Sequence, residues 1–363
     1  MVFNSIFFIF CFLPVFMLIY YLVPGKLRNL LLFLGSLIFY AWGEPVYVIL
    51  MLFSSIFNYY MGTELERLYY DDRKQKINLI FSIIINLAVL VFFKYYGFLL
   101  NTIGGIIGIH IPHPELSLPI GLSFYTFRNL SYLFDIYLSK VSAQRNFLTF
   151  AVYSTMFPYT SAGPIVRYTD IETQLKQRTI NIFKFGIGAE LFVKGLAKKV
   201  LLADNLSVLY SSICGHPQMS VFTSWLGILA YTMQLYFDFS GYSDMAIGLG
   251  KMLGFDFNKN FDYPYISTSV SEFWRRWHIS LGSWFRDYIY IPLGGNRVST
   301  LKHIRNILVV WALTGLWHGA SWNFVLWGVY YGLFLLLEKF VLQKYLKKIP
   351  SWLCTVYTCL LYT

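Results

Sequence analysis

Long apolar runs separated by short polar segments dominate this chain of 363 residues. The first run, residues 3–23, can cross a bilayer core of about 30 Å at about 1.5 Å per residue. It lacks a basic n-region and an A-x-A cleavage site, so we predict an uncleaved span rather than a signal peptide. Residues 29–61 predict a hairpin of two spans, because Gly43 and Pro45 interrupt an otherwise apolar sequence.

The later runs predict a mixture of crossings and shorter elements. Crossings are expected at 77–100 and 119–138, with an external loop at 101–118 between them. Residues 147–161 are apolar but short, with basic charges on both flanks, so this segment is expected to dip into the protein and return. Such backbone is tolerated at membrane depth only where protein or a cavity surrounds it.

The second half of the chain carries more charge inside its apolar runs. Four lysines in residues 180–202 suggest a segment that lies partly in the membrane interface. We expect two apolar stretches joined around residues 238–242, a re-entrant or amphipathic helix pair at 268–291, and two helices or one long tilted helix at 306–337. Asp238 and Asp244 lie inside apolar stretches and should therefore have charged partners.

Composition agrees with this pattern. The residues are 57% hydrophobic, 20% aromatic and only 13% charged, whereas a soluble domain has about 25% charged residues. The fold class predicted is therefore all-α, a polytopic integral membrane protein with re-entrant or amphipathic helices. We expect one domain over residues 1–363. Its last apolar stretch, from Ser351, is too short to span a bilayer, so we expect the domain to continue beyond it.

The net charge of +11 has a simple explanation in such a protein. Cytoplasmic loops of membrane proteins carry excess Lys and Arg and face anionic lipids. Basic clusters at 26–28 and 64–76 are therefore placed on the cytoplasmic side, and no nucleic-acid partner is expected. No metal site is expected either: prolines around His110 and His113 forbid the helix that an i, i+3 ligand pair would use. His216 and His303 are expected at the surface.

Two histidines are the main candidates for chemistry. His318 lies in an apolar run, and intramembrane ionisable groups are rare and usually functional. Near neutral pH an imidazole can accept a proton from a hydroxyl group and return it. His278 lies 40 residues earlier, in a stretch rich in Arg and Trp. For each histidine the alternative is a purely structural role, His318 in packing and His278 at the membrane interface.

Three arginines are weaker candidates. Arg275 and Arg276 precede His278, and Arg167 follows a Gly-Pro break. Guanidinium groups fit phosphate oxygens, so these side chains are candidates for binding a ligand that carries phosphate groups. Structural pairing with nearby carboxylates is the alternative, and we expect it for most arginines of this region.

Several motifs resemble the membrane-bound O-acyltransferase family, in particular the bacterial branch that acetylates extracellular polysaccharides such as alginate. They are residues 119–127 (PIGLSFYTF), 157–168 with AGPIVRY at its end, 241–248 (GYSDMAIG) and the long stretch 262–323. The resemblance implies that His318 occupies the position of the family's catalytic histidine. It also implies that His278 is a second important histidine, which orients the acyl donor or stabilises the oxyanion.

The same resemblance implies a tunnel through the protein, acetyl-CoA as cytoplasmic donor, no bound cofactor, and location in the bacterial inner membrane. The acetyl group would pass to a polysaccharide, or first to an extracytoplasmic partner with a hydrolase-like fold. Within this class, peptidoglycan O-acetylation and D-alanyl transfer to teichoic acid are the alternatives. A transporter for a lipid-linked sugar or a structural scaffold of an export complex would be different kinds of protein.

Overall fold

The structure is a computed structural model that describes residues 1–114, 116–216 and 218–362, and the described residues contain helices and no strands. The all-α prediction is confirmed. The helices are α1 (Leu13–Leu22), α2 (Arg28–Ala41), α3 (Val48–Arg67), α4 (Asp72–Ile107), α5 (Leu122–Tyr137), α6 (Phe147–Thr155), α7 (Tyr168–Lys176), α8 (Ile182–Ala197), α9 (Asp204–Cys214), α10 (Val221–Met252), α11 (Val270–Arg276), α12 (Ile279–Phe285), α13 (Thr300–His318), α14 (Trp322–Leu337), α15 (Gln343–Leu346) and α16 (Ser351–Tyr362).

Among the described residues, three helical segments are long and apolar enough to cross a membrane, namely Val48–Arg67, Asp72–Ile107 and Trp322–Leu346. Of the two spans expected at 29–61, α3 is long enough to cross a membrane, whereas α2 has only 14 residues and is shorter than predicted. The loop expected at 101–118 begins too early, because α4 continues to Ile107 and ends at Gly108, whose φ of 76° stops the helix. The first run forms the shorter apolar helix Phe8–Leu22.

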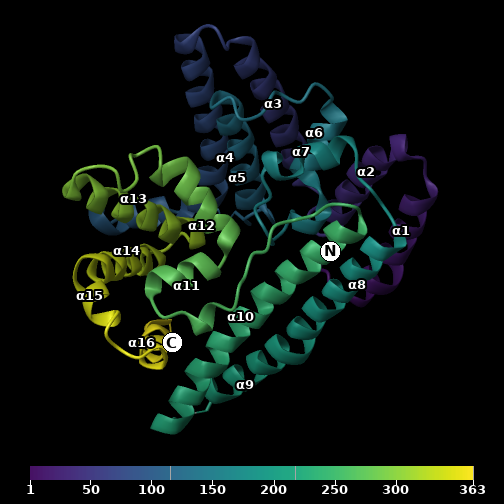
Figure 1. Ribbon diagram of the computed structural model, residues 1–363. Helices are drawn as coiled ribbons and strands as arrows, with labels where there is room; N and C mark the ends of the chain where they lie inside the picture. Colours follow the sequence, from purple (N-terminus) through teal and green to yellow (C-terminus); the bar gives the residue numbers. More distant parts are fainter. Residues whose placement is uncertain (115, 217, 363) are drawn as a thin grey trace.

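A long antiparallel helix pair runs along one side of the molecule (Figure 1). The π-helical turn Lys198–Ala203 joins α8 and α9, and both helices pack against α10. The break expected at 238–242 is wrong, because α10 is continuous through it. Gly241 lets two backbones approach there: a Cβ at Gly241 would lie only 2.7 Å from the carbonyl oxygen of Gly195.

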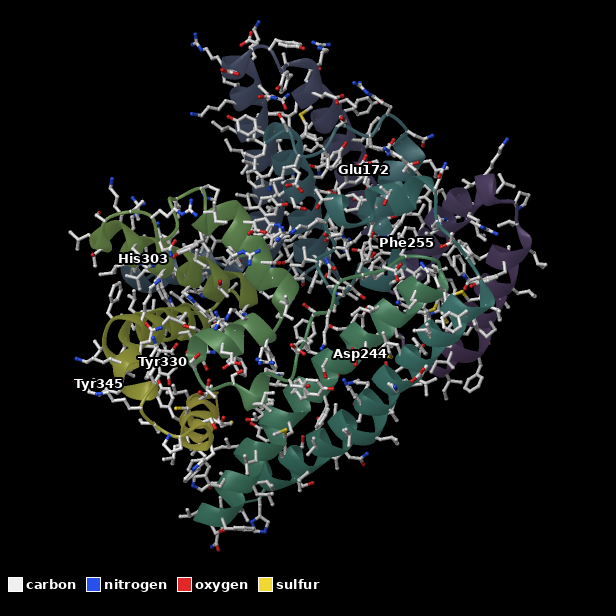
Figure 2. The ribbon with its side chains drawn as sticks, viewed as in Figure 1. Glu172, Asp244, Phe255, His303, Tyr330 and Tyr345 are labelled. Carbon is white, nitrogen blue, oxygen red and sulfur yellow. The ribbon has the colours of Figure 1, made fainter. Side chains whose placement is uncertain are left out.

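The charges of this pair neutralise one another. Lys198 pairs with Asp244 at 2.6 Å, and Lys199 pairs with Asp238 at 2.7 Å. Asp244 is labelled on α10 in Figure 2. The expectation that both carboxylates need charged partners is confirmed, and two lysines of residues 180–202 have a structural explanation.

The short segment predicted to dip into the protein is α6, followed by a 3-10 turn at Phe157–Tyr159. Its residues are buried, so the non-helical backbone lies inside protein as expected. Arg128 of α5 is 0% exposed and donates hydrogen bonds to the carbonyl oxygens of Tyr159 (2.7 Å) and Ser154 (2.9 Å). These bonds fix α6 against α5 at the centre of the fold.

The remaining helices form a separate group beside this core (Figure 1). The helix pair expected at 268–291 is α11 and α12, extended by a π-helical turn at Arg286–Tyr290. The run 306–337 lies in two helices, α13 and α14, which pack against each other. They meet where Gly315 faces Gly328, so the backbones are in direct contact. The break between them places His318 at the last residue of α13.

Candidate active site

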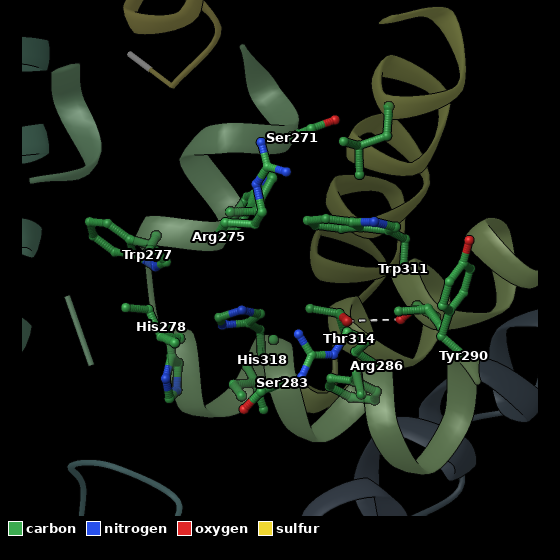
Figure 3. Close-up of a pocket in the computed structure, with 17 residues that line it drawn as sticks. Ser271, Arg275, Trp277, His278, Ser283, Arg286, Tyr290, Trp311, Thr314 and His318 are labelled. Atoms are coloured by element: carbon green, nitrogen blue, oxygen red, sulfur yellow. Dashed lines mark hydrogen bonds between the residues drawn. The ribbon is translucent and has the colours of Figure 1, made fainter. Parts of the chain in front are cut away.

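A cavity of about 320 Å³ lies between α11, α12 and α13, and both candidate histidines line it. Figure 3 shows them with Arg275, which lies above them in this view. Other residues of the wall include Ser271, Ser283, Trp311 and Thr314. The wall is therefore mostly apolar, with a few polar groups that can orient a ligand.

His318 lies among aromatic rings. Its ring centroid is 4.7 Å from that of Trp327 and 4.9 Å from that of Trp317. No hydrogen bond to either ring nitrogen of His318 occurs within the residues that the structure describes. The imidazole can therefore form its hydrogen bonds with a bound substrate.

The end of α13 is held by two side chains of α4. Lys94 donates a hydrogen bond to the carbonyl oxygen of Trp317, and the Tyr95 hydroxyl donates to that of Leu316 at 2.5 Å. The last carbonyl groups of a helix lack intrahelical donors and carry partial negative charge, so a lysine there is favourable. Lys94 has no carboxylate partner in the described part of the chain. In the sequence, Lys94 stands out as a charged residue within the apolar run 77–100, and this is the local feature that could have indicated the contact.

His278 lies at the corner between α11 and α12. Its φ of 45° and ψ of 53° are left-handed, which turns the chain sharply before α12 begins. The side chain is 3% exposed, and its Nδ1 lies 3.1 Å from Oδ1 of Asn260. Its Nε2 is buried and has no hydrogen-bond partner. The Trp317 ring lies 5.7 Å from that of His278 and 4.9 Å from that of His318 between centroids, so one indole contacts both histidines.

The three candidate arginines have different surroundings. Arg275 lines the cavity, and no ion pair or hydrogen bond of its guanidinium occurs among the described residues. Arg276 is not part of the wall and pairs with Glu272 at 2.8 Å. Hydrogen bonds from Thr268 to Glu272 help to hold the pKa of that carboxyl below its usual range. Arg167 lies apart from the cavity and pairs with Asp287 at 2.7 Å.

A second cavity of about 500 Å³ adjoins the first, and Ser271 and Arg275 line both. Lys339 and Lys347 also lie in its wall. With Arg275 they give this space three cationic side chains against the one carboxylate of Glu338, so its wall carries an excess of positive charge that suits an anionic group.

Glu338 connects the chain after His318 to the chain before His278. Its carboxylate is 4% exposed and accepts hydrogen bonds from the backbone N–H groups of Val270 (2.6 Å) and Ser271 (3.1 Å). These are two of the N–H groups at the start of α11 that lack intrahelical acceptors. Glu338 therefore fixes α11 to the end of α14, and no local sequence pattern indicates that this carboxylate faces inward.

His303 is not at the surface as expected. It is 6% exposed, and its Nε2 lies 3.0 Å from the Tyr290 hydroxyl and 3.2 Å from Nζ of Lys339. Figure 2 labels it near the start of α13. Three polar side chains from separate elements meet there, which the sequence spacing could not indicate. His216 is exposed, as expected.

Comparison with known proteins agrees with the motifs. The probable alginate O-acetylase AlgI of Pseudomonas aeruginosa is 45% identical over 93% of this chain and 66% of its own length. The protein of the same name from Azotobacter vinelandii is 44% identical over 93% of this chain and 69% of its own length. The peptidoglycan O-acetyltransferase of Helicobacter pylori is 35% identical over 98% of this chain and 75% of its own length.

The chain thus spans about two thirds of the length of the alginate O-acetylases that it matches. The sequence profile described as MBOAT, membrane-bound O-acyltransferase family, matches residues 41–350, which include α3 to α15 and both histidines. The match covers most of the chain, and the helical membrane fold agrees with it. The chain belongs to the membrane-bound O-acyltransferase family.

Proposed function

We propose that this protein transfers an acetyl group from acetyl-CoA for the O-acetylation of an extracellular polysaccharide. The observation that carries the proposal is the cavity in which His278 and His318 lie together beside the unpaired Arg275. The names of the alginate O-acetylases, at 43–45% identity, favour a polysaccharide as the final acceptor. The lower identity to the peptidoglycan O-acetyltransferase makes peptidoglycan the second candidate.

The chemistry needs a base and a shielded site. A hydroxyl is a poor nucleophile until a base takes its proton. His318 is our candidate for this base. The hydroxyl oxygen would attack the thioester carbonyl carbon, the carbon–sulfur bond would break, and the proton would pass to the leaving sulfur. The products are an acetyl ester and the free thiol of coenzyme A. Aromatic walls around His318 limit access of water, which would otherwise hydrolyse the thioester.

The second cavity is our candidate for the phosphate end of the donor. Its cations Arg275, Lys339 and Lys347 suit phosphate groups, and Arg275 also reaches the cavity of the histidines. A donor bound across both cavities would place its thioester near the histidines. Arg276 and Arg167 are less suitable for this role, since each already pairs with a carboxylate.

The membrane setting adds two further proposals. The basic residues near the second cavity favour a cytoplasmic location for it, by the excess of positive charge on cytoplasmic loops. The protein would then be a multi-pass protein of the bacterial inner membrane that takes acetyl-CoA from the cytoplasm. An extracytoplasmic partner with a hydrolase-like fold would receive the acetyl group, or the polysaccharide would receive it directly.

The test uses the full-length protein in membranes, radiolabelled acetyl-CoA, and the polysaccharide with and without the partner. We expect His318→Ala to abolish acetyl delivery while the protein still folds. His216→Ala is the matched control, because this histidine is exposed in the α9–α10 connection. Full delivery by His318→Ala would refute the assignment and favour a transporter or a scaffold. Transfer of D-alanine instead of acetate would identify the teichoic acid reaction.

A further inference from the structure

The side chain of Asn260 lies beside His278 and takes part in four hydrogen bonds. It is 1% exposed and lies in the extended segment between α10 and α11. Its Oδ1 lies 3.2 Å from the backbone nitrogen of Ser280, 2.9 Å from the Ser280 hydroxyl and 3.1 Å from Nδ1 of His278. Its Nδ2 donates to the Ser243 hydroxyl at 3.0 Å.

These contacts determine the proton position on His278. The two ends of an Asn amide look alike, but a backbone N–H can only donate a hydrogen bond. The amide atom that faces the Ser280 N–H is therefore oxygen. The same oxygen faces Nδ1 of His278 at 3.1 Å. The Ser280 hydroxyl is also 3.5 Å from Nδ1, but it donates its hydrogen to Oδ1 at 2.9 Å, so Nδ1 carries a hydrogen of its own. A neutral imidazole has one N–H, which leaves Nε2 with a free lone pair.

The surroundings favour the neutral imidazole. No carboxylate contacts His278 among the described residues, and a buried charge without a partner is costly. Instead the ring packs at right angles against Phe239, with centroids 4.7 Å apart. Nε2 is the nitrogen left without a partner, on a residue that lines the cavity.

We infer that Asn260 is a positioning residue that locks His278 in the Nδ1–H tautomer, so that Nε2 accepts a hydrogen bond from an N–H or O–H group of the substrate. The inference rests on the proposed function for its substrate. It rules out one of the two roles expected for His278, because stabilising an oxyanion requires an N–H toward the substrate. Orienting a substrate group is the role that remains. In the described part of the chain, no side chain forms a hydrogen bond with a ring nitrogen of His318.

Two groups of the substrates have the required chemistry. One is an amide N–H in the long arm of acetyl-CoA, and the other is the hydroxyl that receives the acetyl group. The two differ in a measurable way. If the group is the amide of acetyl-CoA, loss of the Asn260–His278 hydrogen bond should raise KM for acetyl-CoA. If it is the acceptor hydroxyl, the same loss should raise KM for the acceptor or lower kcat.

The first measurement needs no turnover. Full-length protein labelled with ¹⁵N-histidine is studied by solid-state NMR, and the His278 signals are identified by their loss in His278→Gln. We expect Nδ1 protonated and Nε2 unprotonated in the wild type, and a mixture of tautomers in Asn260→Ala. Protonation of Nε2 in the wild type would overturn the inference, whatever the acetyl-transfer assay shows. A wild type without acetyl transfer would instead overturn the proposed function.

The second measurement compares acetyl transfer by two variants. Partners that orient metal-binding histidines are worth about 10- to 100-fold in activity, and we expect a loss of the same order for Asn260→Ala. Asn260→Asp keeps an acceptor oxygen for Nδ1 and should recover most of this loss. If Asn260 had only a structural role, Asn260→Asp should be less active than Asn260→Ala, because Asp adds a buried charge. Asn258→Ala is the control, since this exposed amide lies two residues away. Equal losses of acetyl transfer in Asn260→Ala and Asn260→Asp, or no loss in Asn260→Ala, would overturn the inference.

Discussion

The crossing of α13 and α14 offers a sharp test of how the fold positions His318. Gly328 of α14 packs directly on Gly315 of α13, about one helical turn before His318. A methyl group at Gly328 would overlap the carbonyl oxygen of Trp311 and lie 3.1 Å from Cα of Gly315, whereas ordinary contact begins at 3.4 Å. Both neighbours are backbone atoms, which cannot rotate away. We expect Gly328→Ala to push the helices apart by about 1 Å, since inserted methyl groups move backbones in packed interiors.

The displacement should affect turnover more than folding. Overpacking costs about 1–3 kcal/mol, which a large helical domain can tolerate. A shift of about 1 Å at a reacting group, in contrast, can reduce the rate about 100-fold. We therefore predict folded Gly328→Ala protein with kcat reduced about 100-fold. The assay is acetyl transfer from radiolabelled acetyl-CoA, with thermal unfolding followed on the same samples.

Gly332→Ala is the matched control on the same helix. Its methyl group would meet side-chain atoms of Trp311 at 3.2 Å and Leu308 at 3.4 Å, which can adjust by a few tenths of an ångström. We expect its activity to stay near that of the wild type. Equal activity of Gly328→Ala and Gly332→Ala would refute the reasoning that this backbone contact sets the position of His318.

Three further predictions concern charged residues. Lys94→Met should leave the protein folded but lower kcat. The variant loses the attraction between the lysine and the carbonyl end of α13, which is worth about 0.3–2 kcal/mol, and an unchanged kcat would contradict this. Glu338→Gln should lower the free energy of unfolding by about 1–3 kcal/mol, since the new NH₂ group would face a backbone N–H donor, and an unchanged melting temperature would show that this carboxylate does not fix α11. Arg275→Gln should raise KM for acetyl-CoA about tenfold with kcat retained, whereas Arg276→Gln should lower stability and leave KM unchanged; the reverse pattern would move the donor site.

The sequence predicted the type of most elements because apolar runs and chain breakers are local signals. The hairpin of α2 and α3, the buried dip at α6 and the pair α11–α12 were all found in this way. The break expected near Gly241 was wrong for a physical reason. Glycine lowers helix propensity, but here it is needed for contact with Gly195, and that benefit depends on a partner helix that is distant in sequence.

The candidate site was only partly predictable. The rarity of ionisable groups in apolar segments identified His318, and the resemblance added His278. Their meeting in one cavity depends on the turn at His278 and on the contacts that both make with Trp317. Asn260 and Lys94 act through long-range hydrogen bonds, 18 and 223 residues from their partners in the chain. No local pattern encodes such contacts.

The hydrogen bonds of Glu338 also set an order of events during synthesis. The carboxylate and the Val270 N–H are 68 residues apart, and both histidines lie in the chain between them. At about 5–20 residues per second, a ribosome needs roughly 3 to 14 s to make that interval. During this time α11 and His278 already exist without the residue that fixes them. The cavity of the two histidines can thus close only after α14 has been made, so the nascent protein already carries α3 and α4, two of its candidate membrane-crossing helices, before this cavity exists.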